Sequence, residues 1–387
     1  MALDLCGCIS SVFVRALTDL VAMYLISDEG EEGRGRGRGG APDPPVIFPT
    51  LRRLCLHSMS SVPSAVLTPF VLAFPFLTHL DLSCTRCTPE LLNGLASSPT
   101  VRLVALSLAR CSRLTSKSVA NLLTRGGSTR DLQQLSLFGD VTCRFPLTKE
   151  DLLQIVTEAP MFHTGNISYL DISSSPVTAE VLAAMPAQPG LRSLGLSSIP
   201  NLSLKAISEF LYTKAQNVEI LTLASSCPEL APPTPIRESI FAIHNTLIEP
   251  LCTRPFSLSL SSPDNQRQQP PTRLRVIELQ ASILSVLGRG AGSWRVIKSN
   301  GARGWYVDTT SGWVAEPGTG SERDTSFQRE LSFDHPIRRS LEQLSESGGN
   351  VSTGVGWHSR KIEVLHGYGL LGHDDGLYGA VSFSSAG

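Results

Sequence analysis

The sequence carries almost no excess charge, because 33 Lys and Arg residues stand against 34 Asp and Glu residues. A chain this balanced generates no long-range field that would attract nucleic acid or an acidic membrane. It also has no run of about 18 apolar residues, so we expect no membrane-spanning helix. The apolar stretch 1–25 is broken by Asp4, Arg15 and Asp19, and no basic segment precedes it. This arrangement argues against a signal peptide.

Motifs that carry catalysis are missing as well. The sequence has no Gly-x-Ser-x-Gly elbow, no Walker A loop and no pair of histidines at zinc-binding helical spacing. Gly367-x-Gly369-x-x-Gly372 resembles a dinucleotide fingerprint, but residues 373–376 (HDDG) indicate a turn where a helix is required. We therefore expect no catalytic residues, no cofactor and no metal. An enzyme or nucleotide binder within residues 290–387 is the alternative.

Cysteine is present without the signs of a disulfide framework. Nine cysteines in a chain without a signal peptide favour reduced thiols and an intracellular protein, cytoplasmic or nuclear. Cys6-x-Cys8 and Cys84-x-x-Cys87 have no second pair at zinc-ligand spacing. Since Cys8, Cys84 and Cys111 recur near one turn position, we expect them to pack between structural repeats.

The most informative stretch that is present is residues 103–123, LVALSLARCSRLTSKSVANLL. Leu106 and Leu108 alternate with small residues, as on one face of a strand. Val119, Leu122 and Leu123 then recur at the spacing of one helix face. The unit is a strand, a turn with cysteine and a helix, which is the pattern of a leucine-rich repeat.

Strands of the same form recur along the chain. Their first positions are 26, 26, 29, 35, 24, 27 and 56 residues apart, and a period in the twenties is typical of leucine-rich repeats. The fold predicted is an α/β leucine-rich-repeat solenoid, with parallel strands inside and helices outside. The wide final gap predicts an extra helix and loop. The strands begin at Leu51, Leu77, Leu103, Leu132, Ile167, Leu191, Val218 and Leu274.

A second pattern recurs in phase with the first. An apolar residue followed by Thr or Ser opens the predicted helix in five repeats, and the hydroxyl can cap the helix N-terminus. The five predicted capping residues are Thr88, Thr115, Thr148, Thr178 and Ser203.

The N-terminal part divides into three regions. Residues 1–28 form a partial repeat, since Leu3-Asp4-Leu5 followed by Cys8 matches the later repeats, and we expect the chain to begin inside a coil. Residues 29–45 are rich in Arg-Gly and proline, a composition typical of a disordered insertion. RNA association through this tract is an alternative function. The solenoid then occupies residues 46–289.

Near residue 290 the composition changes. All four tryptophans lie between 294 and 357, and glycine becomes frequent. Residues 294–298 and 304–308 predict a hairpin, residues 336–345 a helix, and residues 361–365 and 377–383 short strands. We interpret residues 290–387 as a small β-rich module that caps the last coil.

The alternate strand positions predict the concave face. That face is small, neutral and polar, and it lacks the basic stripe that a nucleic acid requires. Aromatic side chains among small ones favour a protein partner, although Phe138 and Tyr169 packing on each other is an equal alternative. We therefore predict a monomeric scaffold that binds a protein of unknown identity and neither membrane nor nucleic acid. The predicted partner-binding residues are His57, His79, Asp81, Gln134, Phe138, Tyr169 and Asp171.

The cysteine-type repeats at 77–88 and 103–115 resemble the ribonuclease-inhibitor-like leucine-rich repeats of F-box receptor subunits of ubiquitin ligases. The residues GWYVD at 304–308 and GWHSRKIEVLHGYGLLGHDDGLYG at 356–379 are similar to the C-terminal ends of fungal leucine-rich-repeat proteins. The first resemblance implies the solenoid fold and a role in substrate recognition for a ubiquitin ligase. The second implies lineage.

Overall fold

The computed structural model describes residues 1–25, 47–231, 234–253, 270–288, 290–298 and 303–308. Within these ranges the strands form one sheet of 12 strands, in the order β1-β2-β3-β4-β5-β6-β7-β8-β9-β12-β11-β10. The predicted elements at 29–45, 336–345, 361–365 and 377–383 lie outside the described residues.

Nine of these strands are parallel and follow the chain order. They are short because each repeat contributes only the residues flanking one core leucine. The strands are β1 (Ala2–Asp4), β2 (Arg53–Cys55), β3 (His79–Asp81), β4 (Ala105–Ser107), β5 (Gln134–Ser136), β6 (Tyr169–Asp171), β7 (Ser193–Gly195), β8 (Ile220–Thr222) and β9 (Val276–Gln280).

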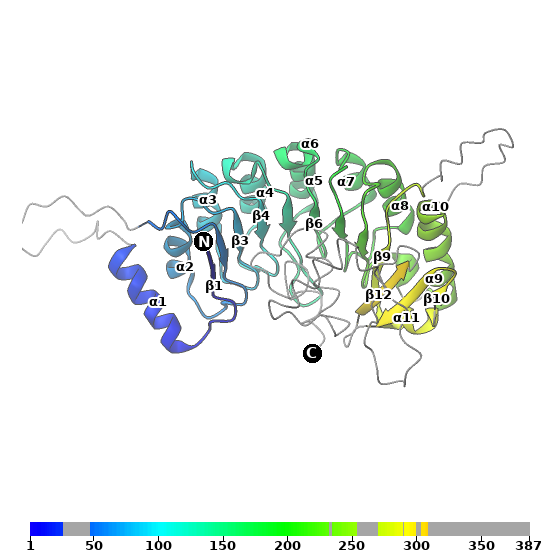
Figure 1. Cartoon of the computed structure of the whole chain (residues 1–387), viewed down its shortest axis with the longest axis horizontal. Helices are drawn as coiled ribbons and strands as arrows, with labels where there is room; N and C mark the ends of the chain where they lie inside the picture. The colour runs from blue at the N-terminus through cyan, green and yellow to red at the C-terminus, as the bar shows by residue number, and fades with distance from the viewer. Residues whose placement is uncertain (26–46, 232–233, 254–269, 289, 299–302, 309–387) are drawn as a thin grey trace, which may run out of the picture.

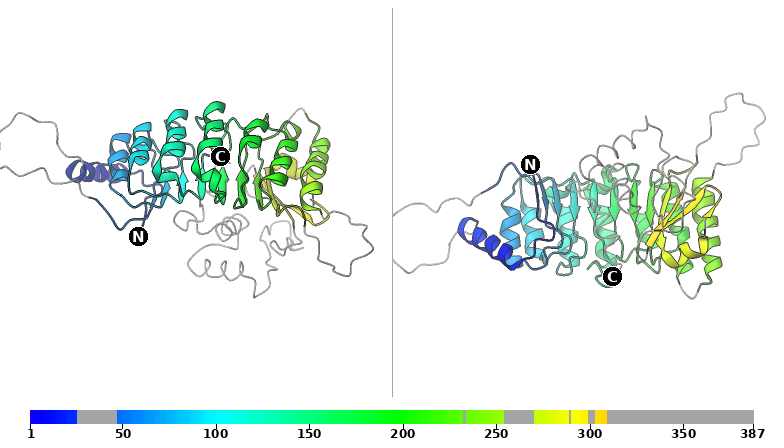
Figure 2. Two further views of the ribbon diagram at one scale, coloured as in Figure 1. Left: turned by 90° about the horizontal axis from the view of Figure 1, so that it is seen from above. Right: turned by 60° about the horizontal axis from the view of Figure 1, so that its bottom comes forward.

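Helices form a second layer on one face of the parallel sheet, and each helix packs beside the helix of the next repeat (Figures 1 and 2). They are α1 (Ser11–Tyr24), α2 (Ser64–Leu72), α3 (Pro89–Ser97), α4 (Ser116–Arg125), α5 (Lys149–Glu158), α6 (Pro160–Thr164), α7 (Ala179–Ala184), α8 (Leu204–Thr213), α9 (Ile236–Ile243), α10 (Glu249–Cys252) and α11 (Ala281–Leu287). Short 3₁₀ turns lie at Gly127–Thr129 and Pro228–Leu230, and a π-helix lies at His244–Ile248.

The core lies between these layers, and the predicted leucine register is confirmed. Leu106 pairs in register with Leu80 and Leu135, and all three side chains are buried. Leu108 lies in a second buried row. The α9–π-helix–α10 segment lies within the 56-residue gap, and it confirms the extra helix predicted there.

Four of the five predicted hydroxyl caps are confirmed. The side chains of Thr115, Thr148, Thr178 and Ser203 each accept a backbone N–H in the first turn of α4, α5, α7 and α8. Thr88 holds the N-cap position of α3 without such a bond. Pro89 follows it, and its fixed φ already suits the first helical position.

The cysteine prediction was wrong at one position. The turn position that packs between coils is three residues after the second core leucine, and Cys111 occupies it, fully buried. In the preceding repeat this position is Thr85, whose hydroxyl donates to the Leu82 carbonyl at 2.6 Å. Cys84 lies one residue earlier, half-buried, with φ of 58°. The turn therefore accepts small side chains of either polarity.

The predicted hairpin near residue 290 is present, and it belongs to the same sheet. β12 (Arg303–Asp308) pairs antiparallel with β9, β11 (Trp294–Lys298) pairs with β12, and β10 (Gly290–Ala291) closes the edge. Residues 290–298 and 303–308 therefore continue the sheet instead of docking on it as a separate body. Residues 309–387 lie outside the described part of the chain.

Candidate functional site

The sheet face opposite the helices presents two rows of side chains that run across the repeats. We call this surface the concave face. One row runs through Arg53, His79, Ala105, Gln134, Tyr169, Ser193, Ile220 and Val276, and the other through Cys55, Asp81, Ser107, Ser136, Asp171, Gly195, Thr222 and Glu278.

The seven residues predicted from the sequence divide by exposure. Asp81, Phe138, Tyr169 and Asp171 are buried, whereas His57, His79 and Gln134 are half-buried. Tyr169 pairs with Gln134 in the sheet register. Because Gln134 precedes Phe138 by four residues, the backbones of Tyr169 and Phe138 are offset by about 13 Å along the strand direction. Phe138 packs against Ala109 of the neighbouring coil.

The two aspartates have a local structural task. Asp81 Oδ1 accepts the backbone N–H of Ser83 at 2.8 Å, and Asp171 Oδ1 accepts that of Ser173 at 2.9 Å. Each carboxylate thereby closes the turn after its strand. The serine hydroxyls extend the bonding between coils, since Ser173 Oγ accepts the Ser197 N–H at 2.9 Å.

Asp171 depends on the glycine beside it. A Cβ built on Gly195 would lie 2.4 Å from the Asp171 carboxylate, so the carboxylate occupies the space that a side chain there would fill. The Tyr169 hydroxyl donates to Asp171 Oδ2 at 3.4 Å. The aspartate, tyrosine and glycine therefore form one unit across β6 and β7.

His79 contributes no positive charge to this face at neutral pH. Burial and the nearby Arg53 cation lower the pKa of His79 to about 4. Its Nδ1 lies 2.9 Å from the Thr78 hydroxyl. The imidazole is therefore a neutral polar group here.

The structure adds a feature that the seven predicted residues miss, a short ordered loop at residues 140–146. Asp140 occupies the buried turn position that Cys111 holds in the preceding repeat. Its Oδ1 accepts the backbone N–H groups of Thr142 and Cys143, both at 2.8 Å. Its Oδ2 lies 3.4 Å from the Arg110 guanidinium. The 35-residue spacing of this repeat was the sequence signal for the loop.

Electrostatics and close backbone packing fix this loop. Burial raises the pKa of Asp140, but hydrogen bonds from Thr142 and Cys143 together with the Arg110 charge outweigh it, and the net pKa is lowered. A Cβ on Gly139 would lie 2.5 Å from the Phe145 nitrogen, so only glycine lets the loop fold back there. The side chain of Val141 remains 73% exposed. An apolar side chain is thus exposed on a loop that hydrogen bonds, an ion pair and close backbone packing hold in place.

A cavity of about 820 Å³ lies at the C-terminal end, between the π-helix and the β10–β11 segment. His244, Cys252, Arg275 and Trp294 contribute to its lining. Burial raises the pKa of Cys252 to about 12, so its thiol is protonated at neutral pH and is a poor nucleophile. His244 Nε2 lies 3.1 Å from the Tyr306 hydroxyl, which joins the extra helix to the final hairpin.

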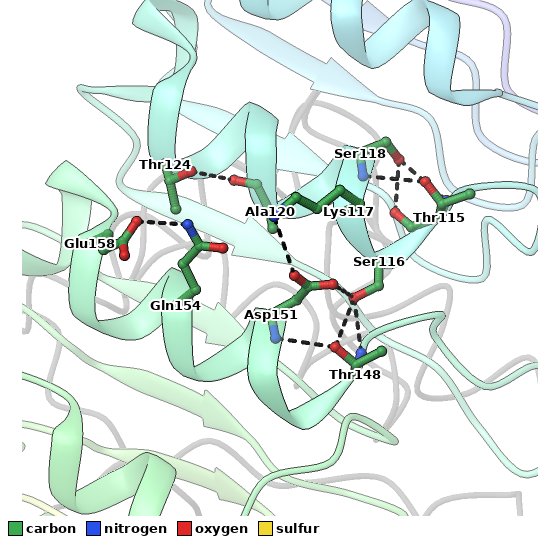
Figure 3. Close-up of polar contacts among 10 residues, drawn as sticks. All are labelled: Thr115, Ser116, Lys117, Ser118, Ala120, Thr124, Thr148, Asp151, Gln154 and Glu158. Atoms are coloured by element: carbon green, nitrogen blue, oxygen red, sulfur yellow. Dashed lines mark hydrogen bonds and ion pairs between the residues drawn. The ribbon is translucent and has the colours of Figure 1, made fainter.

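A cluster of polar side chains links α4 to α5 on the helical layer (Figure 3). Ser116 Oγ donates to Asp151 and accepts the Thr148 N–H at 2.9 Å, while Lys117 Nζ lies 3.9 Å from Asp151 Oδ1. These bonds satisfy the exposed N–H groups of a helix N-terminus. The cluster therefore holds two neighbouring repeats together.

Two further searches cover only the described ranges. Within them, no group of three or more His, Cys, Asp or Glu residues is placed to hold a metal ion. None of the helices there has the length and hydropathy needed to span a bilayer.

The parallel strands, buried leucine rows and flanking helices define a leucine-rich-repeat solenoid. No protein-family model matches the sequence, and no curated protein matches it. Among solved structures, the chain is similar to the Rad7 and Elc1 complex of yeast, at 16% identity and a TM-score of 0.39 over 50% of this chain and 47% of that chain. It is also similar to the TLR13–ssRNA13 complex, at 17% identity and a TM-score of 0.29 over 46% and 26%. The chain spans less than half the length of either structure, and the likeness concerns the fold alone.

Proposed function

We propose that this protein is a non-enzymatic scaffold that binds a protein partner through the concave face and the 140–146 loop. The observation that carries the proposal is the exposed Val141 held on a loop that Asp140 and Arg110 fix in place. A preorganised apolar contact pays little ordering entropy on binding. Half-buried His79 and Gln134, which lie in one row of the concave face, supply polar contacts on the neighbouring strands.

The test is affinity purification from the source cell with the partner identified by mass spectrometry. Val141→Asp places a charge on the loop, and Gln134→Arg places one on the row beside it. Both positions are solvent-accessible, so the fold should persist. Lys205→Glu on α8 is the matched control, since it changes charge at an exposed position of the helical layer.

We expect one partner to be recovered with the unchanged chain and with Lys205→Glu, and to be lost with Val141→Asp and Gln134→Arg. A partner lost only with Lys205→Glu would move the binding surface to the helices. Recovery by all four chains alike would also contradict the proposal.

A narrower form makes the partner a substrate that the chain presents to a ubiquitin ligase. Its support is the resemblance of the cysteine-type repeats to F-box receptor subunits. If it holds, a ligase adaptor should co-purify with the chain, and the recovered partner should carry ubiquitin in a manner that depends on Val141. Recovery of a partner without a ligase adaptor and without ubiquitin would refute this narrower form, and the broader proposal of a protein-binding scaffold would stand.

A further inference from the structure

The concave face is more deeply buried than its place in the fold explains. Side chains of a strand alternate between the two faces of a sheet, so every second one points away from the helices. Helices α2 to α8 lie on the opposite face of the parallel strands (Figure 2). Ser136 and Ser193 are nonetheless fully buried, and Tyr169 is only 2% exposed. Something other than α2 to α8 therefore covers this face.

The burial extends to the C-terminal strands. Trp305 of β12 pairs with Glu278 of β9, so the two side chains lie together on the concave face. Tyr306, the next residue, points to the core and packs there with Trp294. Trp305 and Glu278 are both 0% exposed, although they face away from that core. Buried side chains on the concave face thus extend from Asp81 in β3 to Trp305 in β12.

The width of this buried surface limits which part of the chain can cover it. Seven strand spacings of about 4.8 Å separate β3 from β12, so the surface is roughly 34 Å wide. Residues 254–269 leave from α10 and return at Pro270, so at full extension they reach about 28 Å. Residues 26–46 leave and return at the β1 end, about 43 Å from β12, and reach about 37 Å.

The chain that follows Asp308 has no such limit. It comprises residues 309–387, which is 387 − 308 = 79 residues, and it is tethered to β12 at one end. At full extension this length spans roughly 260 Å, several times the width of the buried surface. Residues 309–387 can therefore cover the whole face and still fold compactly.

The chemistry of the face also fits this segment. The small side chains of Ser136 and Ser193 leave room for large ones, whereas the buried carboxylates of Asp81, Asp171 and Glu278 require donors or cations nearby. Residues 309–387 carry both kinds of side chain. The large aromatic ones include Trp313 and Trp357, and adjacent cations occur at Arg338-Arg339 and Arg360-Lys361.

We propose that residues 309–387 dock on the concave face of their own chain. The tether to β12 favours this occupant over a separate molecule, because it supplies a high effective concentration. This placement differs from the end cap that composition predicts for these residues. Val141 remains 73% exposed, so the cover leaves the 140–146 loop open.

The docked segment would regulate the protein partner, a consequence that rests on the proposed function. A partner that contacts Val141 on the open loop must displace residues 309–387 to reach the strands. Its apparent affinity is therefore reduced in proportion to the fraction of molecules in which the face is uncovered.

Photo-cross-linking on the full chain tests where the segment lies. Benzoylphenylalanine in place of Gln134 puts a photoreactive ketone on the concave face, and the same change at Lys205 on α8 is the matched control. Mass spectrometry of the irradiated, dilute protein identifies the linked peptides. We expect links from position 134 to residues 309–387 of the same molecule, and loss of these links from position 205. Links to residues 26–46 or 254–269 instead, or a product of twice the chain mass, would overturn the proposal.

Cleavage of the folded full chain measures how tightly the segment is held. A protease site introduced at residues 318–320 allows residues 321–387 to be cut free, and we expect them to co-elute with the solenoid and to dissociate on dilution. Ser193→Arg places a charge on the covered face and should weaken this retention by roughly 100-fold. Ser282→Arg, the same change at an exposed position of α11, should leave it unaltered. Circular-dichroism melting curves test the fold of both variants.

The outcomes separate docking from the proposed function. Separation of the cut segment at every concentration would overturn the docking, as would equal retention by Ser193→Arg and the unchanged chain. Once a partner is identified, it should release the cut segment and bind the cut chain more tightly than the intact one. Equal affinity for both chains would overturn the competition. Failure to find any partner would contradict the proposed function alone, because the cross-links and the co-elution need no partner.

Discussion

The two ends of the described solenoid differ in how far their apolar side chains are covered. A repeat stack leaves an apolar flank at each end, because every coil needs neighbours on both sides. At the C-terminal end the sheet continues into the antiparallel strands β12, β11 and β10, and Trp294, Trp305 and Tyr306 are buried there. At the N-terminal end β1 is an edge strand, and α1 exposes Val12 and Met23.

The difference shows what a cap requires. The C-terminal hairpin reverses strand direction at β12, so its side chains no longer follow the repeat and large aromatic rings can cover the last coil. The rings of Trp294 and Tyr306 lie 5.2 Å apart, and Tyr306 also contacts His244 on the extra helix. The first coil keeps the sequence pattern of an internal repeat, and no such reversal of strand direction occurs between β1 and β2, which pair in parallel.

The largest effect should come from the aromatic cap. Trp294→Ala should lower the free energy of unfolding by about 3–5 kcal/mol, because the ring belongs to the buried core and leaves a cavity. Met23→Ala at the other end should change it by less than about 0.5 kcal/mol, since that side chain is mostly exposed. Urea unfolding of dilute protein measures both. Equal losses would show that the two ends are packed alike.

A middle coil gives the reference for both ends. Leu106 is fully buried with coils on either side, so Leu106→Ala should cost about 2–5 kcal/mol. Leu3 occupies the same row in β1 but is only partly buried, and Leu3→Ala should cost clearly less. Urea unfolding again gives the values. An unchanged midpoint for Leu106→Ala would mean that the strand register is wrong.

Strict periodicity explains which features could be predicted from the sequence. Leu106 and Leu108 fall where a strand must point into the core, and the hydroxyl of Thr115 falls where a helix must begin. These requirements are local, and the same pattern of residues recurs in each repeat. Cys84 shows the limit of residue identity as a signal, because the spacing from Leu82 places Thr85, and not Cys84, at the buried turn position.

Features that depend on distant partners could not be predicted in this way. The pairing of β12 with β9 joins segments separated by the α11 helix, and no local pattern specifies it. The role of Asp140 also escaped, because its partner Arg110 comes from the preceding repeat. The signal for this role was an aspartate three residues after Leu137, at a turn position that is buried in the neighbouring repeats.

The exposure of side chains on α1 could not be predicted either, because it depends on which helices pack beside α1.

The 140–146 loop is held by charge, whereas the C-terminal end is held by aromatic packing. Acid should therefore weaken the loop and leave the aromatic packing unchanged. The pKa of Asp140 is lowered in the fold, so its contribution to stability is present above its ordinary pKa of 3.8 and is lost as pH falls below that value. Asp140→Asn should lower the free energy of unfolding by about 1 kcal/mol at neutral pH.

That difference should shrink as urea unfolding is repeated at pH values falling through this range. The titration of His79 is common to both chains and cancels in the difference. A difference that stays constant with pH would show that Asp140 acts through its shape and not its charge.

The smallest effects should appear at the helix N-termini, where neighbouring coils allow a matched comparison. Thr115 accepts the Ser118 N–H at 3.2 Å, and the Ser118 hydroxyl in turn accepts the Thr115 N–H, which completes a capping box. Thr115→Ala should therefore cost about 1 kcal/mol. Thr88 holds the same position in α3 without accepting a backbone N–H of the helix, so Thr88→Ala should cost only a few tenths of a kcal/mol. Both substitutions remove the same atoms at equivalent sites, so the difference between their unfolding midpoints isolates the capping bond. Equal losses would show that the threonines act by packing and not by capping.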